Sequence, residues 1–513
     1  MVAGASQSRR GQCQAKPKPY LGPFCSTRVT GPLWRGWPAL LLAGCSFAPA
    51  YVQPELPVPA QYPGAVPAGE SVARLGWQDF FRDPELRRLI ALALENNRDI
   101  RIAAARVQEA RAAWRIEGAS LYPQLNVAAS GQFGRTEVDL PLARNVPLDV
   151  RLINVEVGAG WEIDFWGRLR NLRDAARWQY LASEEARRGV ATQLVAQVAN
   201  GYLLEREYEE RAALAQSSIR TRQESLRIIR RRFEVGSGSK LDMTQAQTLL
   251  GQAQTALYAL EQDQAVNRNA LALLVGRPVT VASSNRRLAA ISEDIQLPPG
   301  LPSELLVNRP DIIAAERQLR AANANIGAAR AAFFPNIRLT GGVGVSNGEL
   351  GIGSVELGDL FSDPVTIWSF APTISVPIFN GGRLRSNLDV ARARQVRSVA
   401  EYERTIQVAF RDVADALVRR QQLARQIDTT RQVLDALTER ARLANLRFEY
   451  GRSTYLEVLE AQRDLFETEQ LLVQLRRADL ASAVALYAAL GGGFTPPTVF
   501  DSDPRENRRA PEP

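Results

Sequence analysis

Apolar and polar residues alternate in four segments of the chain, at about 124–134, 152–165, 336–346 and 367–379. A period of two is typical of a β-strand that turns one face to an apolar medium and the other to water. Segments of about ten residues with this pattern have the length of a membrane-crossing strand. Soluble hairpins packed against helices would show the same alternation, so the pattern alone leaves both interpretations open.

Two other stretches, 168–232 and 383–448, contain no proline and are rich in alanine, leucine, arginine, glutamine and glutamate. These residue types favour helix. A helix of about 65 residues spans nearly 100 Å at roughly 1.5 Å per residue. In the second stretch, apolar residues recur at three- and four-residue steps, which predicts a coiled-coil seam at Leu423, Ile427, Leu434, Leu437, Ala441 and Ala444.

The chain also repeats itself at long range. The run Phe233-Glu234-Val235-Gly236 and the run Phe448-Glu449-Tyr450-Gly451 stand 215 residues apart, and the stretches 99–123 and 311–335 align at an offset of 212. Landmarks in the same order at nearly the same offset indicate two copies of one structural unit. Each copy is predicted to contain a helix, a pair of strands, a very long helix, a glycine turn and a second long helix.

This repeat sets the expected organisation of the chain. Gly236 and Gly451 are expected to end the long helices, because glycine adopts the positive φ of a helix C-terminus at low cost. The predicted parts are a leader at 1–44, a lipidated proline-rich arm at 45–75, a first repeat at 76–280, a linker at 281–300, a second repeat at 301–493 and a disordered tail at 494–513.

Four strands cannot close on themselves in a membrane. Both edges would leave backbone N–H and C=O groups unpaired in hydrocarbon, at a cost of several kcal/mol each. Common membrane barrels begin at about eight strands, so oligomerisation is expected, with two copies supplying eight strands or three supplying twelve. The periodicity does not choose between these two assemblies.

Composition removes several classes of function. The net charge of +8 comes mainly from six basic residues before Cys45, and without them the balance is 57 basic to 55 acidic residues. A nearly neutral chain with scattered charges lacks the basic stripe that nucleic-acid binding needs. Histidine is absent and the cysteines are Cys13, Cys25 and Cys45 alone, which removes imidazole bases, histidine metal sites and Cys-His nucleophiles. We therefore expect no enzyme activity, no metal and no cofactor.

The N-terminus has the pattern of a bacterial lipoprotein signal. A short apolar stretch follows Arg35 and ends in Leu42-Ala43-Gly44-Cys45, where small residues admit the signal peptidase and the cysteine thiol accepts a diacylglycerol. Diacylglycerol and N-acyl lipid on Cys45 would anchor the mature chain durably, because more than one acyl chain is attached. The leader is long and irregular, so the true start stays open between Met1 and Val29.

Several separated motifs lie between Cys45 and about Gly493. They are Trp77 with Phe80, Phe81, Asp83 and Leu86; 97–100; 161–168; 300–303 with 309–312; 333–335; 377–383; and 456–462. In these motifs the chain resembles the outer-membrane efflux factors, the TolC-type family, and specifically its lipoprotein branch, which serves resistance-nodulation-division multidrug pumps.

The resemblance implies a fold and a set of partners. The implied fold is mainly α with a small β part: a homotrimer whose twelve strands form an outer-membrane β-barrel, continued by a long α-helical barrel in the periplasm. The implied partners are a periplasmic adaptor (membrane fusion) protein and an inner-membrane transporter. The implied location is the outer membrane, lipid-anchored and membrane-spanning.

The predicted functional site is the periplasmic end of the helices. Glu457 and Glu460 lie one helical turn apart, and threefold symmetry would gather six carboxylates there. The resemblance implies an acidic constriction at Glu460 beside an apolar ring at Leu456. In the first copy the positions that match Glu457 and Glu460 are Asp242 and Gln245, which are less acidic. The turns at Gly236 and Gly451 are expected to contact the adaptor. The alternative is that these acids form an ordinary solvated face near a helix start.

The function expected from these features is an exit duct that passively conducts small toxic compounds or drugs from the periplasm to the exterior. A duct for type I protein secretion is the alternative within the same class. A non-conducting periplasmic coiled-coil scaffold lipoprotein is the alternative of another class, and a membrane-anchored hydrolase with paired carboxylates is a weaker one, because the acids are dispersed along helices. Ion conductance separates a duct from a scaffold, whereas the sequence does not name the exported compounds.

Overall fold

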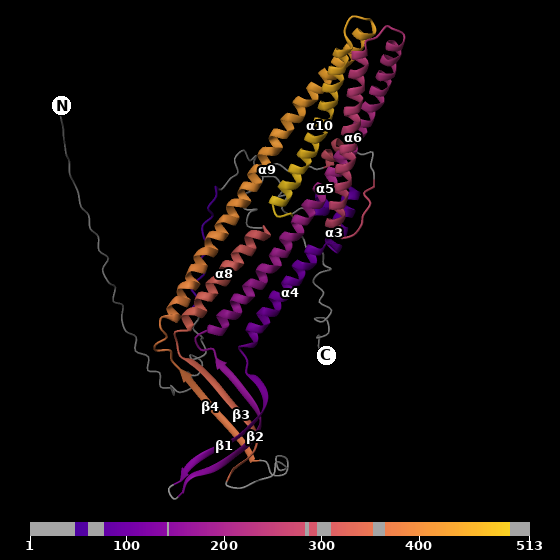
Figure 1. Ribbon diagram of the computed structural model, residues 1–513. Helices are drawn as coiled ribbons and strands as arrows, with labels where there is room; N and C mark the ends of the chain where they lie inside the picture. Colours follow the sequence, from indigo (N-terminus) through magenta and orange to yellow (C-terminus); the bar gives the residue numbers. More distant parts are fainter. Residues whose placement is uncertain are drawn as a thin grey trace, which may run out of the picture. The chain divides into compact units, whose positions relative to one another are not determined.

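The structure is a computed structural model that describes residues 47–59, 76–140, 143–282, 287–294, 309–351 and 365–492. Its elements, shown in Figure 1, are α2 (Trp77–Phe80), α3 (Pro84–Asn96), α4 (Arg98–Ala119), β1 (Gln124–Leu140), β2 (Ala143–Ile163), α5 (Arg168–Glu234), α6 (Lys240–Val275), α7 (Leu288–Asp294), α8 (Pro310–Ala331), β3 (Asn336–Gly351), β4 (Val365–Ser375), α9 (Arg383–Glu449) and α10 (Tyr455–Ala489). The predicted unit occurs twice, as α4–β1–β2–α5–α6 and as α8–β3–β4–α9–α10. The prediction of a mainly helical chain with a small β part is confirmed.

The long helices α5 and α9 have 67 residues each, as the proline-free stretches predicted. Each ends in a turn whose glycine has positive φ, 80° at Gly236 and 68° at Gly451. In the first turn the N–H of Ser237 donates to the carbonyl of Arg232, and the N–H of Gly236 donates to the carbonyl of Phe233. This is the Schellman pattern that closes a helix C-terminus. No helix among the described residues has both the length and the apolar character that crossing a membrane requires.

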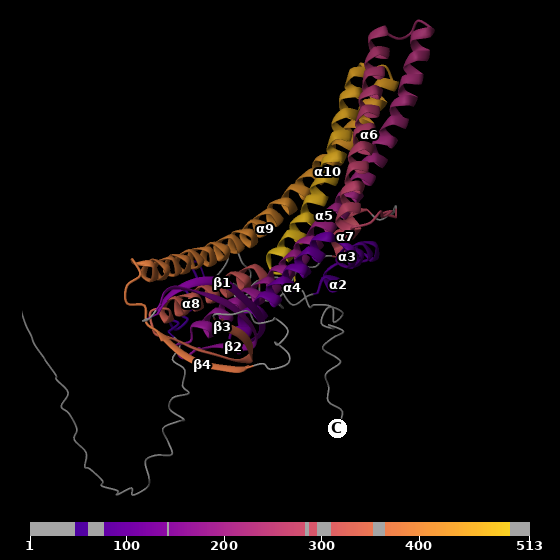
Figure 2. The same cartoon turned by 60° about the horizontal axis from the view of Figure 1, so that its bottom comes forward.

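The helices pack as neighbours from both repeats. Helix α5 contacts α4, α6 and α8, and helix α9 contacts α8 and α10. Next to the sheet, the four helices α4, α5, α8 and α9 lie side by side, and farther along the two hairpins α5–α6 and α9–α10 continue together (Figures 1 and 2). An ion pair of 3.0 Å between Arg317 of α8 and Glu185 of α5 joins the repeats.

The main apolar core of the described residues forms where the short helices α2, α3 and α7 meet the long ones. Phe80 stacks on Tyr487 of α10 with ring centroids 4.3 Å apart, and Phe81 meets the same ring edge-on. Asp83 caps α3 by accepting hydrogen bonds from two backbone amides, and Pro84 takes the first helical position. The hydroxyl of Tyr202 on α5 also donates to Asp83. These contacts fasten the N-terminal helices to both repeats. Figure 2 shows α3 and α7 beside α5.

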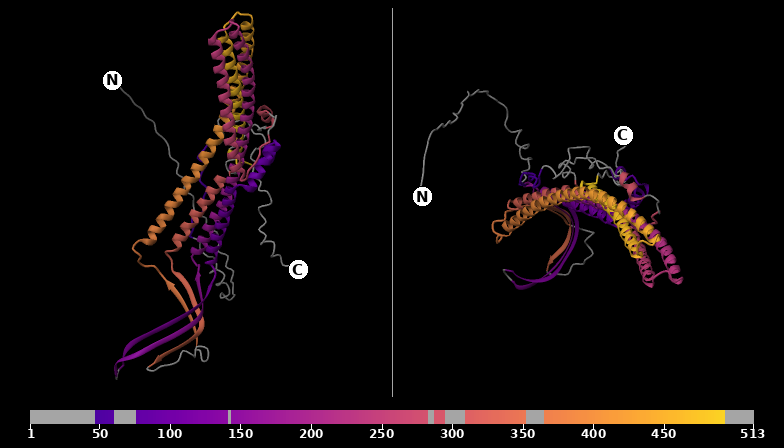
Figure 3. Two further views of the ribbon diagram at one scale, coloured as in Figure 1. Left: turned by 45° about the vertical axis from the view of Figure 1, so that its right-hand side comes forward. Right: turned by 90° about the horizontal axis from the view of Figure 1, so that it is seen from above.

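The four strands form one antiparallel sheet in the order β1-β2-β3-β4, so that β2 and β3 join the two repeats. The sheet is visibly curved (Figure 3). Three strands are longer than the alternation predicted: β1 continues to Leu140, β2 begins at Ala143 and β3 continues to Gly351. In β2 the apolar positions change from even to odd numbers at Leu152 and Ile153, so the alternation that runs on from Ile153 does not extend back into 143–151. Backbone pairing with β1 continues across this change.

The fourth strand is shorter than predicted. It was expected to reach residue 379, but it ends at Ser375, which pairs with Asn336, the first residue of β3. Beyond this point β3 offers no further partner. The predicted lipidation site Cys45, the leader, the tail from 494, part of the arm and much of the linker lie outside the described residues.

Candidate functional site

One face of the sheet is apolar across all four strands. The register aligns Val127 with Val157, Val157 with Val343 and Val343 with Trp368, so one row of apolar side chains crosses the sheet. Adjacent rows on this face include Leu125, Ala159, Trp161, Leu339, Phe370 and Ile374. Several of these side chains are exposed in the single chain, with Trp368 at 79% and Val127 at 73%. An exposed apolar surface of this extent indicates contact with lipid or with another chain.

The opposite face is polar. Its residues include Asn126, Glu156 and Ser369, and the Ser346 hydroxyl donates to Asn154 Oδ1 at 2.6 Å. The extensive contacts of the described strands are with other strands and not with helices. The soluble alternative, hairpins packed against helices, is therefore not the arrangement observed. A sheet with one apolar and one polar face fits a boundary between hydrocarbon and water.

The far ends of the two helical hairpins are joined by a second apolar cluster. Ile229 of α5, Ala246 of α6, Ala444 of α9 and Val458 of α10 are all buried in it. The Arg232 guanidinium lies 4.7 Å from the centroid of the Phe448 ring, which ties the first hairpin to the second. Such a cation–π contact contributes about 0.5–1 kcal/mol at an exposed site.

Tyr455 begins α10 inside this cluster, with its ring 5.1 Å from that of Phe448. Burial raises the pKa of the Tyr455 hydroxyl. Below the cluster, Arg222 of α5 is buried, donates to the carbonyl of Leu249 at 2.7 Å and lies over the Phe466 ring. Burial lowers the pKa of this guanidinium. The hairpin ends are thus packed units and not loose turns.

The predicted gate residues lie at the start of the returning helices. Leu456, Glu457 and Glu460 are on the first turns of α10, and Asp242 is on the first turn of α6. Leu456 is 47% exposed, and Leu241, its counterpart at the offset of 215, is exposed as well. Gly236 and Gly451 stand at the hairpin ends, where a side chain would meet open space.

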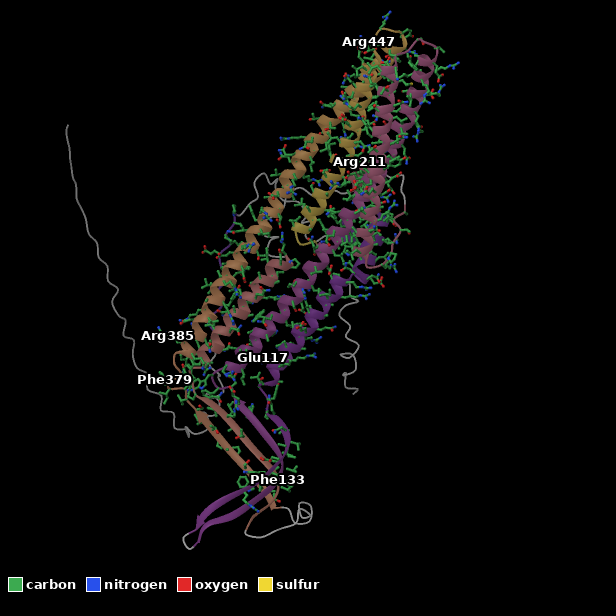
Figure 4. All side chains as sticks on the ribbon, viewed as in Figure 1. Glu117, Phe133, Arg211, Phe379, Arg385 and Arg447 are labelled. Carbon is green, nitrogen blue, oxygen red and sulfur yellow. The ribbon has the colours of Figure 1, made fainter. Side chains whose placement is uncertain are left out.

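Arginines of α9 pair with the acids of the predicted gate, and the sequence analysis did not identify these arginines. Arg447, labelled at the hairpin end in Figure 4, pairs with Glu457 at 3.4 Å. Arg440 lies 4.0 Å from Glu460 and pairs with Asp464 at 2.7 Å. Hydrogen bonds from Arg463 and Arg440 overcome the opposing effect of desolvation and lower the pKa of Asp464. The signal was present, because a turn at Gly451 brings residues at similar distances before and after it together.

The arm after the predicted lipidation site is bound along α8. Phe47 stacks on Phe334 with centroids 4.5 Å apart, Asn323 donates to the carbonyl of Pro49 at 2.7 Å, and the Tyr51 hydroxyl donates to Glu316 at 3.1 Å.

Gly327 makes this approach possible, because a Cβ there would lie 2.8 Å from the amide nitrogen of Ala48. At the offset of 212, the first repeat has Arg115 in place of Gly327 and Arg111 in place of Asn323. The arm therefore fits the second copy of this helix and not the first.

Nothing in the described residues points to bound metal or phosphate. No group of three or more acidic, histidine or cysteine side chains is placed to hold a metal there. The run 236–240, rich in glycine and serine, connects helix α5 to helix α6. A phosphate loop follows a strand, so this run is a hairpin turn.

These features define a class of protein, a membrane-channel subunit built from a duplicated unit of two strands and a long helical hairpin. A family model described as "Outer membrane efflux protein" matches residues 89–277 and 301–492, one match to each repeat. The chain belongs to this family of outer-membrane channel proteins.

Named relatives agree with this assignment. The chain is 40% identical over 461 residues to the cation efflux system protein CusC of Escherichia coli O6:H1, covering 89% of this chain and 97% of that one. It is 42% identical over 465 residues to the solvent efflux pump outer membrane protein SrpC of Pseudomonas putida, covering 89% and 97%. It is 39% identical over 460 residues to the probable outer membrane lipoprotein SilC of Salmonella typhimurium, covering 88% and 97%.

A solved structure extends the likeness to three dimensions. A crystal structure of CusC, whose title describes transmembrane channel formation, superposes with a TM-score of 0.78 at 39% identity. The match covers 87% of this chain and all of that chain.

Proposed function

We propose that this protein is the outer-membrane exit duct of a tripartite efflux pump, through which small toxic compounds pass from the periplasm to the exterior. The observation that carries the proposal is the sheet, which has a continuous apolar face and two open edges. A single chain with such a sheet is incomplete in a membrane, because unpaired backbone groups in hydrocarbon are costly.

Three copies are the proposed assembly. Each copy supplies four strands, so a ring of three has about the strand number that encloses a water-filled passage, whereas eight strands leave room only for side chains or one small ligand. The polar sheet face would line this passage and the apolar face would meet lipid. The helices would continue the ring into the periplasm, where α5 and α9 extend it by about 100 Å at 1.5 Å per residue.

The partners proposed are a periplasmic adaptor and an inner-membrane transporter of the resistance-nodulation-division class. The hairpin ends carry Gly236 and Gly451 with open space around them, which supports these turns as the adaptor contact. The duct has no energy source of its own, so a partner protein must supply the energy that drives export. Transport through the proposed duct is therefore passive.

A gate is proposed at the same end. In a trimer, Leu456 and Leu241 would provide an apolar constriction, flanked by Glu457, Glu460 and Asp242. The arginine partners of two of these acids reduce the net negative charge of the ring. We expect a weakly cation-selective opening and not a strongly acidic filter.

The anchor proposed is diacylglycerol and N-acyl lipid on Cys45. The bound arm supports it, because Phe47 lies two residues beyond Cys45, within about 7 Å of extended chain. Phe47 packs beside Trp166 and Phe334, close to where strands and helices meet. An acyl chain attached there would enter the membrane at the foot of the sheet.

The names of the relatives CusC and SrpC refer to efflux of cations and of solvents, which supports small compounds as the cargo and not secreted proteins. The scaffold alternative gives no role to the exposed apolar sheet face. The deciding experiment is conductance of the purified protein in planar bilayers. Discrete steps from a trimeric sample are expected, and a sample that inserts without conducting would favour the scaffold.

A further inference from the structure

The two repeats treat one arginine differently at the point where the sheet meets the long helices. In the first repeat, Asp164 follows β2 and Arg170 lies in the first turn of α5, and their side chains form an ion pair of 3.2 Å. The offset of 215 residues places Phe379 and Arg385 at the matching positions of the second repeat. The second repeat therefore keeps the arginine but has phenylalanine in place of its carboxylate partner.

The missing carboxylate is not replaced by another one nearby. Asp164 also caps α5, because it accepts hydrogen bonds from two backbone amides of the first turn. In the second repeat Asn380 takes over the cap and accepts from the amide of Leu384 at 3.3 Å, but its side chain carries no charge. Within the described ranges of the chain, the exposed side chain of Arg385 has no ion pair and no hydrogen bond. Its guanidinium is a cation without a counter-charge.

The packing of α9 shows on which side of the helical layer this guanidinium lies. Three residues that directly follow buried ones pack against the core that includes the short helices; they are Phe410, Ala414 and Leu417. Two that directly precede buried ones, Asp412 and Asp415, line a cavity between α5, α9 and α10. Leu384 is buried, so Arg385 lies on the side of the short helices and Arg383 on the other side, because residues two apart differ by about 200° around a helix. Figure 3 shows the short helices on the convex side of the layer, which is the outer side of the proposed ring.

Arg385 also lies at the level where the apolar sheet face ends. Figure 4 shows Arg385 and Phe379 together at the end of α9 that is nearest the sheet. In the segment that joins β4 to α9, Ile378 is 93% and Phe379 92% exposed, so apolar side chains are followed within a few residues by an exposed cation. An arginine at such a boundary lays its aliphatic stem along apolar surface and keeps its guanidinium in the polar layer.

We propose that Arg385 binds the headgroup phosphate of an anionic phospholipid in the periplasmic leaflet, with Phe379 in the adjoining hydrocarbon. A guanidinium recognises phosphate through two parallel hydrogen bonds, and anionic lipids attract basic residues at the membrane surface. Arg170 is neutralised by Asp164 and is not such a site, so each chain holds one lipid. This inference rests on the proposed function, because the lipid reaches Arg385 only if the sheet spans the membrane.

Native mass spectrometry of the full-length protein in a neutral detergent tests the site, with phosphatidylglycerol and zwitterionic phosphatidylethanolamine added at equal concentration. Arg385→Gln removes the proposed contact, and Arg383→Gln is its matched control, because it removes an equally exposed arginine from the opposite side of α9. Phe379→Asp gives Arg385 the partner that Arg170 has in the first repeat. Phe379→Asn is the control for the loss of the phenyl ring without added charge.

The unaltered trimer is expected to retain three phosphatidylglycerol molecules and to prefer them to phosphatidylethanolamine. Arg385→Gln and Phe379→Asp should each weaken this binding about fivefold, the effect of one arginine at an anionic surface, whereas Arg383→Gln and Phe379→Asn should stay within twofold of the unaltered protein.

Phosphatidylglycerol binding that is unchanged in Arg385→Gln would overturn the site. A trimer that Arg385→Gln dissociates without a change in lipid preference would assign the arginine to a carboxylate of the neighbouring copy and overturn it too. Free glycerol phosphate that binds as tightly as the lipid would assign the site to soluble phosphate. Conductance is measured on the same samples: a conducting trimer without lipid preference refutes this inference alone, whereas an unaltered protein that does not conduct refutes the proposed function.

Discussion

The orientation of the sheet can be tested at two adjacent residues. Trp368 lies on the apolar face in a row with Val343, and Ser369, the next residue along β4, lies on the polar face. Arginine on the lipid-facing side of a membrane strand costs about 2–4 kcal/mol near the middle of the bilayer. Three copies would sum to roughly 6–12 kcal/mol per trimer, which is comparable with the whole stability of an ordinary domain.

We therefore expect Trp368→Arg to reduce the trimer in outer membranes at least tenfold and to lower its urea midpoint in vesicles. Ser369→Arg, on the water-facing side, is expected to retain both within twofold of the unaltered protein. Trp368→Leu separates the effect of charge from the loss of the indole ring and should resemble the unaltered protein. Equal losses for Trp368→Arg and Ser369→Arg would refute the assignment of the two faces.

Three further outcomes follow from the helices and the arm. Gly451→Ala forces a side chain into positive φ at a cost of about 1–2 kcal/mol, so hydrogen exchange at the hairpin end should become faster. The control is Gly251→Ala inside α6, where a Cβ meets open space; it should stabilise the helix by about 0.5–1 kcal/mol. A change of the same sign in both variants would contradict this explanation of the turn. Replacing Glu457 and Glu460 by alanine leaves Arg447 and Arg440 without these partners. It should lower the cation-to-anion permeability ratio about threefold, the effect of one unit charge near 6 Å in water, whereas replacing both arginines by alanine should raise the ratio. Unchanged ratios in single-channel recordings would refute the proposed gate. Desolvation, and then the charge of Glu316, raises the pKa of Tyr51 to about 12, above the ordinary value near 10. The contribution of Tyr51 to holding the arm is therefore complete below about pH 10 and is lost as the pH rises through 12. Limited proteolysis should show this step in the unaltered chain but not in Tyr51→Phe, and a step of equal size in both would assign it to another group.

The helical part of the fold was readable from the sequence because its signals are local. Proline-free stretches and a glycine that permits positive φ fixed α5, α9 and the turn at Gly451. The start of β2 was not readable, because its apolar positions change from even to odd numbers at Leu152 and Ile153, whereas its backbone pairing with β1 continues across that change. The end of β4 was not readable either, because it is set by the start of β3: Ser375 pairs with Asn336, the first residue of that strand.

The predicted gate shows a different limit. Glu457 and Glu460 were identified from their spacing on one helix, but spacing within a helix says nothing of Arg447 and Arg440 on the helix before it. These ion pairs appear only once the hairpin is folded. Likewise, the binding of the arm depends on Gly327, a residue without chemistry of its own whose role is to leave space.

That space has a consequence for symmetry. Gene duplication produced two opening helices of similar plan, and only the one with Gly327 admits the arm, since Arg115 fills the same position in its twin. In the proposed ring, six modules would alternate around the axis, and only every second one would hold a tether to the bilayer. Any force transmitted from the acyl chains would then act on the wall of the duct at three points 120° apart. The wall is therefore expected to deform with the threefold symmetry of the chains and not with the sixfold symmetry of the repeat modules.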